Sequence, residues 1–449
     1  MPLTTFIPAF ITRRPFPAIL ALGLLLRLGY AWIMREHLLL GDGGFYHGTA
    51  ERILMGEPFS PFWPPGLPYL LALFMYVGGQ HLVSVVAGMM LVYVAFASLL
   101  HHVVRKWVTE RAANLVSLVF AVSPAFIHHS VTPLTHLPVA LCLLTIACIA
   151  WNAREKYRLW EAVWAGLALG AAILIRPGSL ILAPVLFFLL IRYLPAAGWK
   201  RVLHVALPFV LAGCMVLAWE LQTFHRHQRI VWVNDGNSSN FYLGNNPWTP
   251  LYKTWWLGSH NESENPHFAD FYAQGREIMA LPQAEQGPAF TRIAWHHISE
   301  SPGLFLVRSF SRIRCFFAFD TFTAGVIHHR VPGAMPFTLL VLAVDGLIYV
   351  LIGSFALLGF ARGLNAGGPG GMLLLLVLAY AFPYFIAFSH PTYHLPVVPL
   401  LAIVAASEWE KRATSLFFLR KNPLTALLLL IFWGLQVEWV WHMKSSLGF

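Results

Sequence analysis

Long apolar runs of about 16 to 25 residues recur along the whole chain and are separated by short polar segments. A helix needs about 20 apolar residues to cross the roughly 30 Å hydrocarbon core of a bilayer, where its backbone must satisfy its own hydrogen bonds. The pattern therefore predicts an all-α polytopic membrane protein with about eleven transmembrane helices. We expect these helices near residues 16–35, 81–101, 112–128, 134–152, 160–175, 179–191, 202–221, 335–360, 372–389, 395–408 and 424–442.

The charge of the chain indicates orientation in a membrane rather than binding to nucleic acid. The net charge is +10, but only 11% of the residues are charged, so the basic residues must be read loop by loop. If the spans alternate, one set of loops holds Arg105, Lys106, Arg111, Arg154, Lys156, Arg158, Arg192, Lys200, Arg201, Arg362, Lys411, Arg412, Arg420 and Lys421. By the positive-inside rule these loops are cytoplasmic, and no nucleic-acid partner is indicated. The short turns on the opposite side hold only Arg176.

The apolar stretch 64–79 is too short for a crossing. As a helix it would reach about 24 Å, and counting it as a span would reverse the side of Arg105 and Lys106. We therefore expect it to lie at, or dip into, the outer interface. The chain then divides into an N-terminal transmembrane module, 1–221, with a first outer loop, 36–80; an extracytoplasmic segment, 222–334, with an amphipathic interfacial helix; and a C-terminal transmembrane module, 335–449.

Asp42 is the main catalytic candidate on the outer side. It stands among glycines in "GDGG", residues 41–44, where we expect the small residues to let a substrate approach the backbone. A carboxylate beside an apolar, partly dehydrated surface can act as a general base toward a hydroxyl group. The alternative is a solvated turn without a catalytic role.

Several outer cations could hold an anionic group such as a lipid phosphate. Arg176 lies between two spans, where an arginine is unfavourable unless it pairs or reaches the interface. Arg308 and Arg312 are spaced i, i+4 and Arg314 follows, so these three could form a second phosphate clamp or reach ordinary head groups. In "SHPTYHLPVVP", His390, Tyr393 and His394 could bind a phosphate or a sugar, or form part of an aromatic belt.

No metal site is indicated by spacing. The four cysteines lack CxxC spacing, and the His-His pairs lack the i, i+4 spacing of helical zinc ligands. A divalent cofactor at the catalytic site is left open.

Several stretches, taken in order, resemble bacterial family-39-like glycosyltransferases of the GT-C class, relatives of protein O-mannosyltransferases and of the lipid A aminoarabinose transferase. The matching stretches are "GDGGFYHGTAERILMGE", "FWPPGLPYLLALF", "LIRPGSLILAP", "NFYLGNNPWTP", "ESPGLFLVRSF" and "HPTYHLPVVPLLAIVAA". The resemblance implies a GT-C-like bundle whose extracytoplasmic loops carry interfacial helices.

The resemblance also implies an activity, which is transfer of one sugar from a polyprenyl-phosphate donor to an extracytoplasmic acceptor. It implies a bacterial inner membrane, with the active site on the periplasmic face and Asp42 as general base. Inversion at the anomeric carbon would follow from a single displacement. We expect the cleft for sugar and acceptor to include Tyr46, Trp63, His136, Tyr242, Asn245 and Asn246.

The chain departs from the family pattern at three places. Gly43 stands where some relatives have a second acidic residue, and His136 stands where many have an acidic residue before the fourth span. Thr392 and His394 replace the two arginines of the family's His-Pro-Arg-Tyr-Arg sequence. Arg176, the arginines near 308–314 or His394 would then have to bind the phosphate.

Three other functions remain open at this point. A flippase or transporter of lipid-linked saccharides would need charges near the middle of the membrane, for which Arg27, Glu220 and Asp345 are the candidates. An oligosaccharide ligase or polymerase of related architecture would differ mainly in the size of its donor. A degenerate, non-catalytic member of the family is the third. Sequence leaves the sugar, the acceptor and the oligomeric state undetermined.

Overall fold

The computed structural model describes residues 15–155, 157–195, 197–251, 257, 262–263, 266–366 and 369–444, and these residues form helices and no strand. The helices are α2 (Pro15–Ile33), α3 (Asp42–Met55), α4 (Gly66–Gly78), α5 (Leu82–Val104), α6 (Glu110–Val122), α7 (Pro124–His128), α8 (His136–Asn152), α9 (Leu159–Ile175), η2 (Pro177–Ile181), α10 (Leu182–Tyr193), α11 (Gly198–His227), α12 (Gly236–Gly244), η3 (Pro266–Phe268), α14 (Ala269–Met279), α15 (Gln283–Glu300), α16 (Pro302–Phe316), α17 (Phe322–Arg330), α18 (Met335–Ala366), α19 (Pro369–Ile386), η4 (Pro391–Val397), α20 (Val398–Glu410), η5 (Arg412–Thr414), α21 (Ser415–Lys421) and α22 (Pro423–Lys444).

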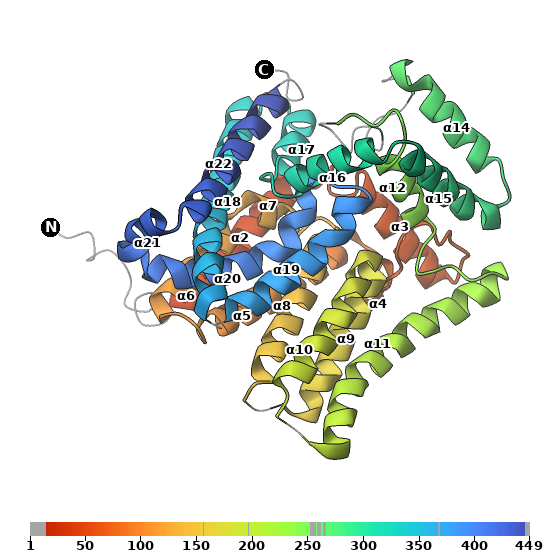
Figure 1. Cartoon of the computed structure of the whole chain (residues 1–449). Coiled ribbons are helices and arrows are strands. Elements are labelled where there is room, and N and C mark those ends of the chain that lie inside the picture. Colours follow the sequence, from red (N-terminus) through yellow and green to blue (C-terminus); the bar gives the residue numbers. More distant parts are fainter. Residues whose placement is uncertain are drawn as a thin grey trace.

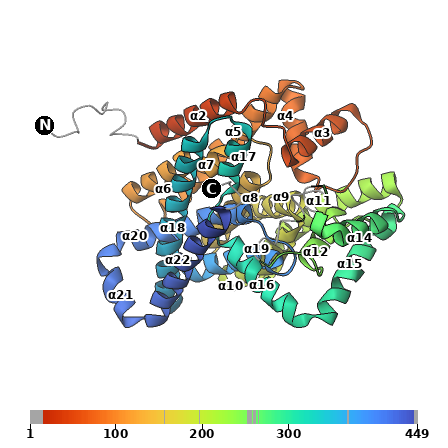
Figure 2. The same ribbon diagram turned by 90° about the horizontal axis from the view of Figure 1, so that it is seen from above.

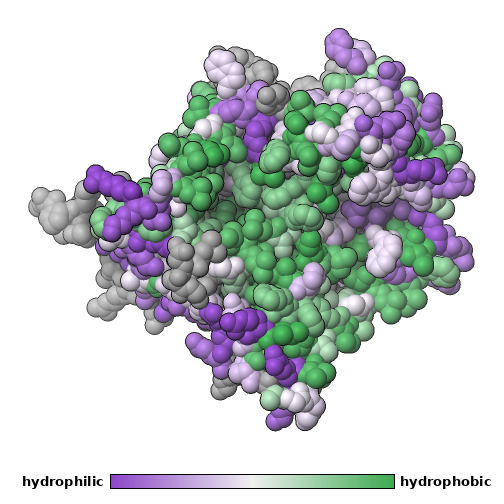
Figure 3. Space-filling view, in the orientation of Figure 1, coloured by the Kyte–Doolittle hydropathy of each residue, from purple (hydrophilic) through white to green (hydrophobic). Residues whose placement is uncertain are grey.

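The helices are those of a multi-pass membrane protein, as the hydropathy pattern predicts. Among the described residues, α2, α5, α11, α18 and α22 are long and apolar enough to cross a bilayer, and α4, α8, α9, α19 and the segment Pro177–Tyr193 are shorter apolar helices. Figure 3 shows hydrophobic residues gathered across the middle of one face, with polar residues toward its upper right and its lower end. The predicted fold class is confirmed, whereas the number of spans stays a prediction.

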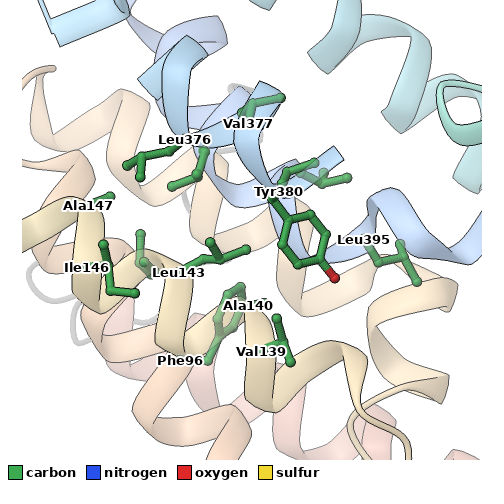
Figure 4. Packing of buried hydrophobic residues seen from close by; sticks show 14 of the residues in the cluster. Phe96, Val139, Ala140, Leu143, Ile146, Ala147, Leu376, Val377, Tyr380 and Leu395 are labelled. Carbon is green, nitrogen blue, oxygen red and sulfur yellow. The ribbon is translucent and has the colours of Figure 1, made fainter. Parts of the chain in front are cut away.

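The central core lies where α5, α8 and α19 pack together. Figure 4 shows Val139, Leu143 and Ile146 of α8 near Phe96 of α5, with Tyr380 of α19 on the other side. Helix α8 is buried around most of its circumference, which is typical of a helix at the centre of a bundle. This packing holds the residues at the end of α8 in a fixed position.

Some of the segments predicted to be cytoplasmic are joined to one another at one end of the bundle. Hydrogen bonds and an ion pair join the loop after α5 to the ends of α8 and α20, and the end of α18 to the end of α20. The pairs are Lys106 Nζ with Asn152 Oδ1 at 2.9 Å, Thr109 N with Glu410 Oε1 at 2.8 Å, and Arg362 Nε with Glu408 Oε1 at 3.0 Å. The turns predicted to lie outside are at the opposite ends of the same helices.

The predicted span 112–128 is not one helix. Helix α6 ends at Val122, and α7 begins at Pro124, because proline has no N–H for an interior helical hydrogen bond but fits the first position of a helix. Arg27, which is fully buried, donates to the carbonyls of Phe120 at 3.2 Å and Ala121 at 3.1 Å at the end of α6. Asp345 accepts from the N–H of Ala125 at 3.0 Å at the start of α7. A cation at the C-terminal end and an anion at the N-terminal end match the two helix dipoles.

The charges considered for a transporter therefore have structural partners. Besides Arg27 and Asp345 at the α6–α7 break, Glu220 accepts a hydrogen bond from the N–H of Val233 at 2.8 Å. The three side chains hold separate pieces of backbone in place. None of the described contacts joins these three side chains to one another, as a charge relay would require. The structure therefore gives no support to the transporter alternative.

The outer segment contains its own small hydrophobic cluster. Tyr242 of α12, Phe271 and Ile278 of α14, and Phe290 and Ala294 of α15 are buried together. Figures 1 and 2 both place α12, α14 and α15 beside one another at one end of the molecule, with α16 continuing from α15.

Helix α4 has 13 residues, too few to span the hydrocarbon core at 1.5 Å per residue, and packs against α3, α5 and α9.

Candidate functional site

Asp42 is the first residue of α3, and its position depends on the glycines around it. Gly41 has φ +64°, a left-handed conformation that favours glycine. A Cβ added at Gly44 would lie 2.2 Å from the carbonyl oxygen of Leu39. Gly44 is therefore required by the close packing of the chain on itself, which corrects the expectation that it serves to admit a substrate.

The Asp42 carboxylate is exposed to solvent, yet protein surrounds it closely enough to limit its hydration. Loss of hydration raises the pKa of Asp42 above its ordinary value, and the positive charge of Arg176 opposes this rise. Because water still reaches the side chain, the carboxylate can exchange its proton with solvent. A carboxylate with a raised pKa is a better general base than an ordinary surface aspartate.

Arg176 follows the last residue of α9 and is held by neutral groups. Its guanidinium donates to Thr135 Oγ1 at 2.7 Å, His136 Nε2 at 2.9 Å and Tyr384 OH at 3.3 Å, and it lies over the ring of Tyr393, 4.6 Å from the centroid. Because a guanidinium can only donate, Nε2 of His136 must accept, so the ring proton of His136 is on Nδ1. None of these partners cancels the charge of Arg176.

Asp42 and Arg176 lie in one electrostatic environment without forming an ion pair. Each influences the ionisation of Tyr46, which is buried on α3, and of Tyr393 in η4. No ion pair joins the carboxylate to the guanidinium in this described part of the chain. A base and an uncompensated cation thus face a common region, which is an arrangement suited to a substrate that carries both a hydroxyl group and a phosphate.

His390 belongs to this cluster and His394 does not. His390 Nδ1 is 2.8 Å from Thr392 Oγ1, and its ring packs against Tyr393. Burial lowers the pKa of His390, and the positive charge of Arg176 lowers it further. His394, one turn further on, packs against Tyr349 at 4.5 Å between ring centroids and lines a separate small cavity with Asp320 and Asp345. Its assignment to the carrier phosphate remains a prediction that this placement does not favour.

Two departures from the family pattern lie side by side. The rings of His136 and Tyr393 are 6.4 Å apart, so the position that many relatives fill with an acid adjoins the segment in which both family arginines are replaced. The chain lacks one negative and two positive charges here. Arg176 is the cation that remains beside them.

The arginines of α16 are engaged within the protein. Arg308 donates to the carbonyls of Asn246, Pro247 and Thr249, with the last two at 3.1 and 2.8 Å. Arg312 donates to the carbonyls of Gly244 at 3.1 Å and Ala387 at 2.7 Å and to Asn245 Oδ1 at 3.1 Å. Arg314 is paired with Glu438 at 2.7 Å. Their role as a carrier-phosphate clamp remains a prediction, and the geometry favours Arg176 instead.

The residues expected in the sugar and acceptor cleft separate into two groups. Trp63 is half-buried and packs against Tyr46 at 5.5 Å, near Asp42, where its ring could stack on a sugar. Tyr242 is a core residue of the outer segment and donates to Gln274 Oε1 at 2.7 Å. Asn245 and Asn246 use their amide groups to hold the turn after α12.

Sequence reasoning missed Thr135, Tyr384 and His129. Tyr384 connects the site to the core, because it receives a hydrogen bond from Arg176 and donates to Tyr380 at 3.3 Å. The ring of His129 lies 4.3 Å from that of His136. The sequence indicated a role for Tyr384 only by its place after Pro383, near the end of an apolar helix. Nothing in the local sequence indicates a role for Thr135.

The described residues do not fit a resident metal ion. They bring together no group of three histidine, cysteine, aspartate or glutamate side chains placed as ligands, and Asp42 is followed by Gly43. We derive no step through a metal.

Comparisons with known proteins support the resemblance. Residues 63–219 match the sequence model of the dolichyl-phosphate-mannose-protein mannosyltransferase family. Among curated protein sequences, none matches the chain. Among solved structures, the archaeal oligosaccharyltransferase AglB of Archaeoglobus fulgidus is similar in its complex with an inhibitory peptide and a dolichol-phosphate, with TM-score 0.50, 14% identity and 96% of this chain covered. The Archaeoglobus fulgidus enzyme is also similar in its apo form, with TM-score 0.50, and in complex with Zn and sulfate, with TM-score 0.51, each at 14% identity.

These structural neighbours are longer proteins. The chain spans about half of their length, covering 55%, 56% and 52% of the three chains, while 96%, 96% and 94% of this chain is matched. At this identity the likeness establishes the fold, and the family match over residues 63–219 agrees with it. The resemblance inferred from the sequence motifs is thereby confirmed, and the chain is a helical, multi-pass membrane protein of GT-C glycosyltransferase-like fold.

Proposed function

We propose that this protein transfers a single sugar from a polyprenyl-phosphate donor to a hydroxyl group of an extracytoplasmic acceptor, with Asp42 as general base and Arg176 as the phosphate-binding cation. The acceptor is a glycolipid, a wall polymer or a protein. The enzyme works in the inner membrane of a bacterium, with its active site on the periplasmic face. The GT-C-like fold and the match to a mannosyltransferase family support this proposal.

One observation carries it. Asp42 at the start of α3 and Arg176 after the end of α9 are far apart in the sequence but share one electrostatic environment without forming an ion pair, and the other contacts of Arg176 are all neutral. A guanidinium that is held in place without a counter-charge can bind an anion. A carboxylate nearby can accept a proton from a bound hydroxyl group.

The reaction is a single displacement. Asp42 takes the proton of the acceptor hydroxyl, and that oxygen forms a bond to the anomeric carbon. The bond between the anomeric carbon and the phosphate oxygen breaks, and polyprenyl phosphate leaves with the electron pair. Arg176 stabilises the charge that develops on the leaving phosphate, and the proton on Asp42 returns to water. Attack opposite the leaving group inverts the anomeric configuration.

The charge balance of the site favours a donor with one phosphate. Within the described residues, Arg176 is the cation that acts on Asp42, and the surrounding histidine and tyrosine side chains are neutral hydrogen-bonding groups. A sugar linked through one phosphate carries one negative charge, whereas a diphosphate-linked donor carries two. This reasoning separates the proposal from an oligosaccharide ligase that uses a diphosphate carrier.

The test is transfer of labelled sugar from membranes containing polyprenyl-phosphate sugars, with wild type and Asp42→Asn at matched expression. Loss of a general base should reduce the rate by about a hundredfold or more. Asp270→Asn, at an exposed position in the first turn of α14, is the matched control and should transfer at the wild-type rate. Equal transfer by Asp42→Asn would show that Asp42 is only a turn residue.

A further inference from the structure

A cavity lies within the outer segment, away from the Asp42–Arg176 site. Its volume is about 90 Å³, well above the roughly 10–15 Å³ that one water molecule needs. The turn after α12, the C-terminal end of α15 and the first turns of α16 form its walls. Two stretches that carry the family resemblance, "NFYLGNNPWTP" and "ESPGLFLVRSF", thus meet at this cavity.

The cavity wall contains a buried cation without a counter-charge. Arg308 is 5% exposed, and its guanidinium is held by three main-chain carbonyls while its Nε has no hydrogen-bond partner. Arg312, fully buried one turn later, is likewise bound to neutral acceptors. Burial lowers the pKa of Arg308 to about 10, and burial together with the charge of Arg308 lowers the pKa of Arg312 to about 9. Two buried guanidinium groups without a carboxylate are unfavourable unless an anion compensates them.

The other polar groups of the cavity complement an anion. His297 has a buried Nε2 without a partner, and its Nδ1 lies 3.9 Å from the carboxylate of Glu300. The Oδ1 atom of Asn246 already accepts from the N–H groups of Trp248 and Thr249 and is not free for a ligand donor. Glu300 is at the solvent side, where His296 Nε2 lies 3.2 Å from its carboxylate. The inner wall therefore offers the unpaired Nε–H of Arg308 as a donor, beside a buried positive charge that an anionic ligand would compensate.

The geometry of α16 indicates that this ligand comes from the aqueous side. Leu306, Val307 and Phe310 are 58, 53 and 71% exposed and form an apolar face that fits the membrane surface. At 100° per residue, Leu304 and Arg308, which line the cavity, lie about 120–160° around the helix from Leu306 and Phe310, and Val307 lies between the two faces. The cavity is therefore on the side of α16 that faces away from lipid.

We propose that this cavity binds an anionic group, a phosphate or a carboxylate, and that the group belongs to the acceptor. The assignment to the acceptor rests on the function proposed above, whereas anion binding itself does not. An acceptor anchored at Arg308 would be oriented before its hydroxyl reaches Asp42. The acceptor that fits carries its phosphate or carboxylate on a part that projects into water.

Anion binding is tested on the full-length protein in nanodiscs of zwitterionic lipid, by thermal unfolding in inorganic phosphate and in acetate against chloride at equal ionic strength. At a phosphate concentration of about ten times Kd, we expect the wild-type Tm to rise by about 1–3 °C. Leu304→Trp, which fills the cavity, should lose the rise, and Leu306→Trp on the opposite face of α16 should keep it. No rise in wild type, or an equal rise in Leu304→Trp, would overturn the anion site.

Two further arms test the source of the anion. If nanodiscs containing phosphatidylglycerol abolish the phosphate effect, a lipid head group occupies the cavity and the aqueous acceptor is refuted. In the transfer assay, Leu304→Trp should raise KM for the acceptor at least tenfold and leave KM for the donor unchanged. A change confined to donor KM would overturn the acceptor assignment. A wild type that transfers nothing but shows the phosphate effect would refute the proposed function and the acceptor assignment, and leave anion binding established.

Discussion

His136→Asp is the substitution that tests most directly whether the charge of Arg176 binds the donor phosphate. His136 Nε2 is a neutral acceptor 2.9 Å from Arg176 Nη2. An aspartate at this position would form an ion pair with the guanidinium and compete with the phosphate for the same charge. The change also restores the acidic residue that many relatives have at this position, but without their two arginines.

The size of the effect follows from the geometry. Two unit charges about 4 Å apart interact by about 4 kcal/mol at an effective dielectric constant of about 20. Arg176 is only half-buried, so solvent screening reduces this to about 2 kcal/mol. At 1.4 kcal/mol per factor of ten, KM for the donor should rise roughly 30-fold.

The assay measures initial rates of sugar transfer over a range of donor concentrations with saturating acceptor. His136→Asn keeps an amide oxygen as acceptor but adds no charge, so its donor KM should change by no more than about threefold. Acceptor KM should be the same in both variants. If donor KM is equal in His136→Asp and His136→Asn, the charge of Arg176 does not hold the phosphate and the proposed site is wrong.

Three further predictions test other parts of the structure. In Arg176→Gln, the pKa of Asp42 should rise because the opposing positive charge is lost. The acid limb of the residual kcat/KM profile should therefore move to higher pH, and an unchanged limb would show that the charge of Arg176 does not act on Asp42. In Arg27→Met, the buried carbonyls at the end of α6 lose their donor, so the free energy of unfolding, measured by heat or denaturant, should fall by about 3 kcal/mol or more. An unchanged free energy of unfolding would show that Arg27 does not stabilise the break between α6 and α7. Gly44→Ala should reduce both stability and transfer because its Cβ would collide with backbone. Gly48→Ala on the same helix meets open space, so it should transfer at the wild-type rate and be at least as stable as wild type.

The sequence by itself determined the membrane location and the helical class, and it predicted the grouping of the loops. These properties depend on local features, namely the length of each apolar run and the charge of each connection. Asp42 and Arg176 could be assigned to the same side in this way, because side follows from counting spans. Counting spans does not show where each helix begins and ends, however. The span expected at 112–128 is two helices, and the second begins at Pro124.

The tertiary structure decided which charged and polar side chains are free to act. Arg176, Arg308 and Arg314 look alike in sequence as outer arginines, but Arg314 is paired with Glu438, and Arg308 is bound by the main-chain carbonyls of a distant turn. Arg176 is held by neutral side chains and is the cation that acts on Asp42. His394 faces a different cavity from His390, although one turn separates them. The partner of a buried side chain is set by whichever residues the packing of other helices brings beside it. Local composition does not contain that information, and so it could not be predicted from the sequence.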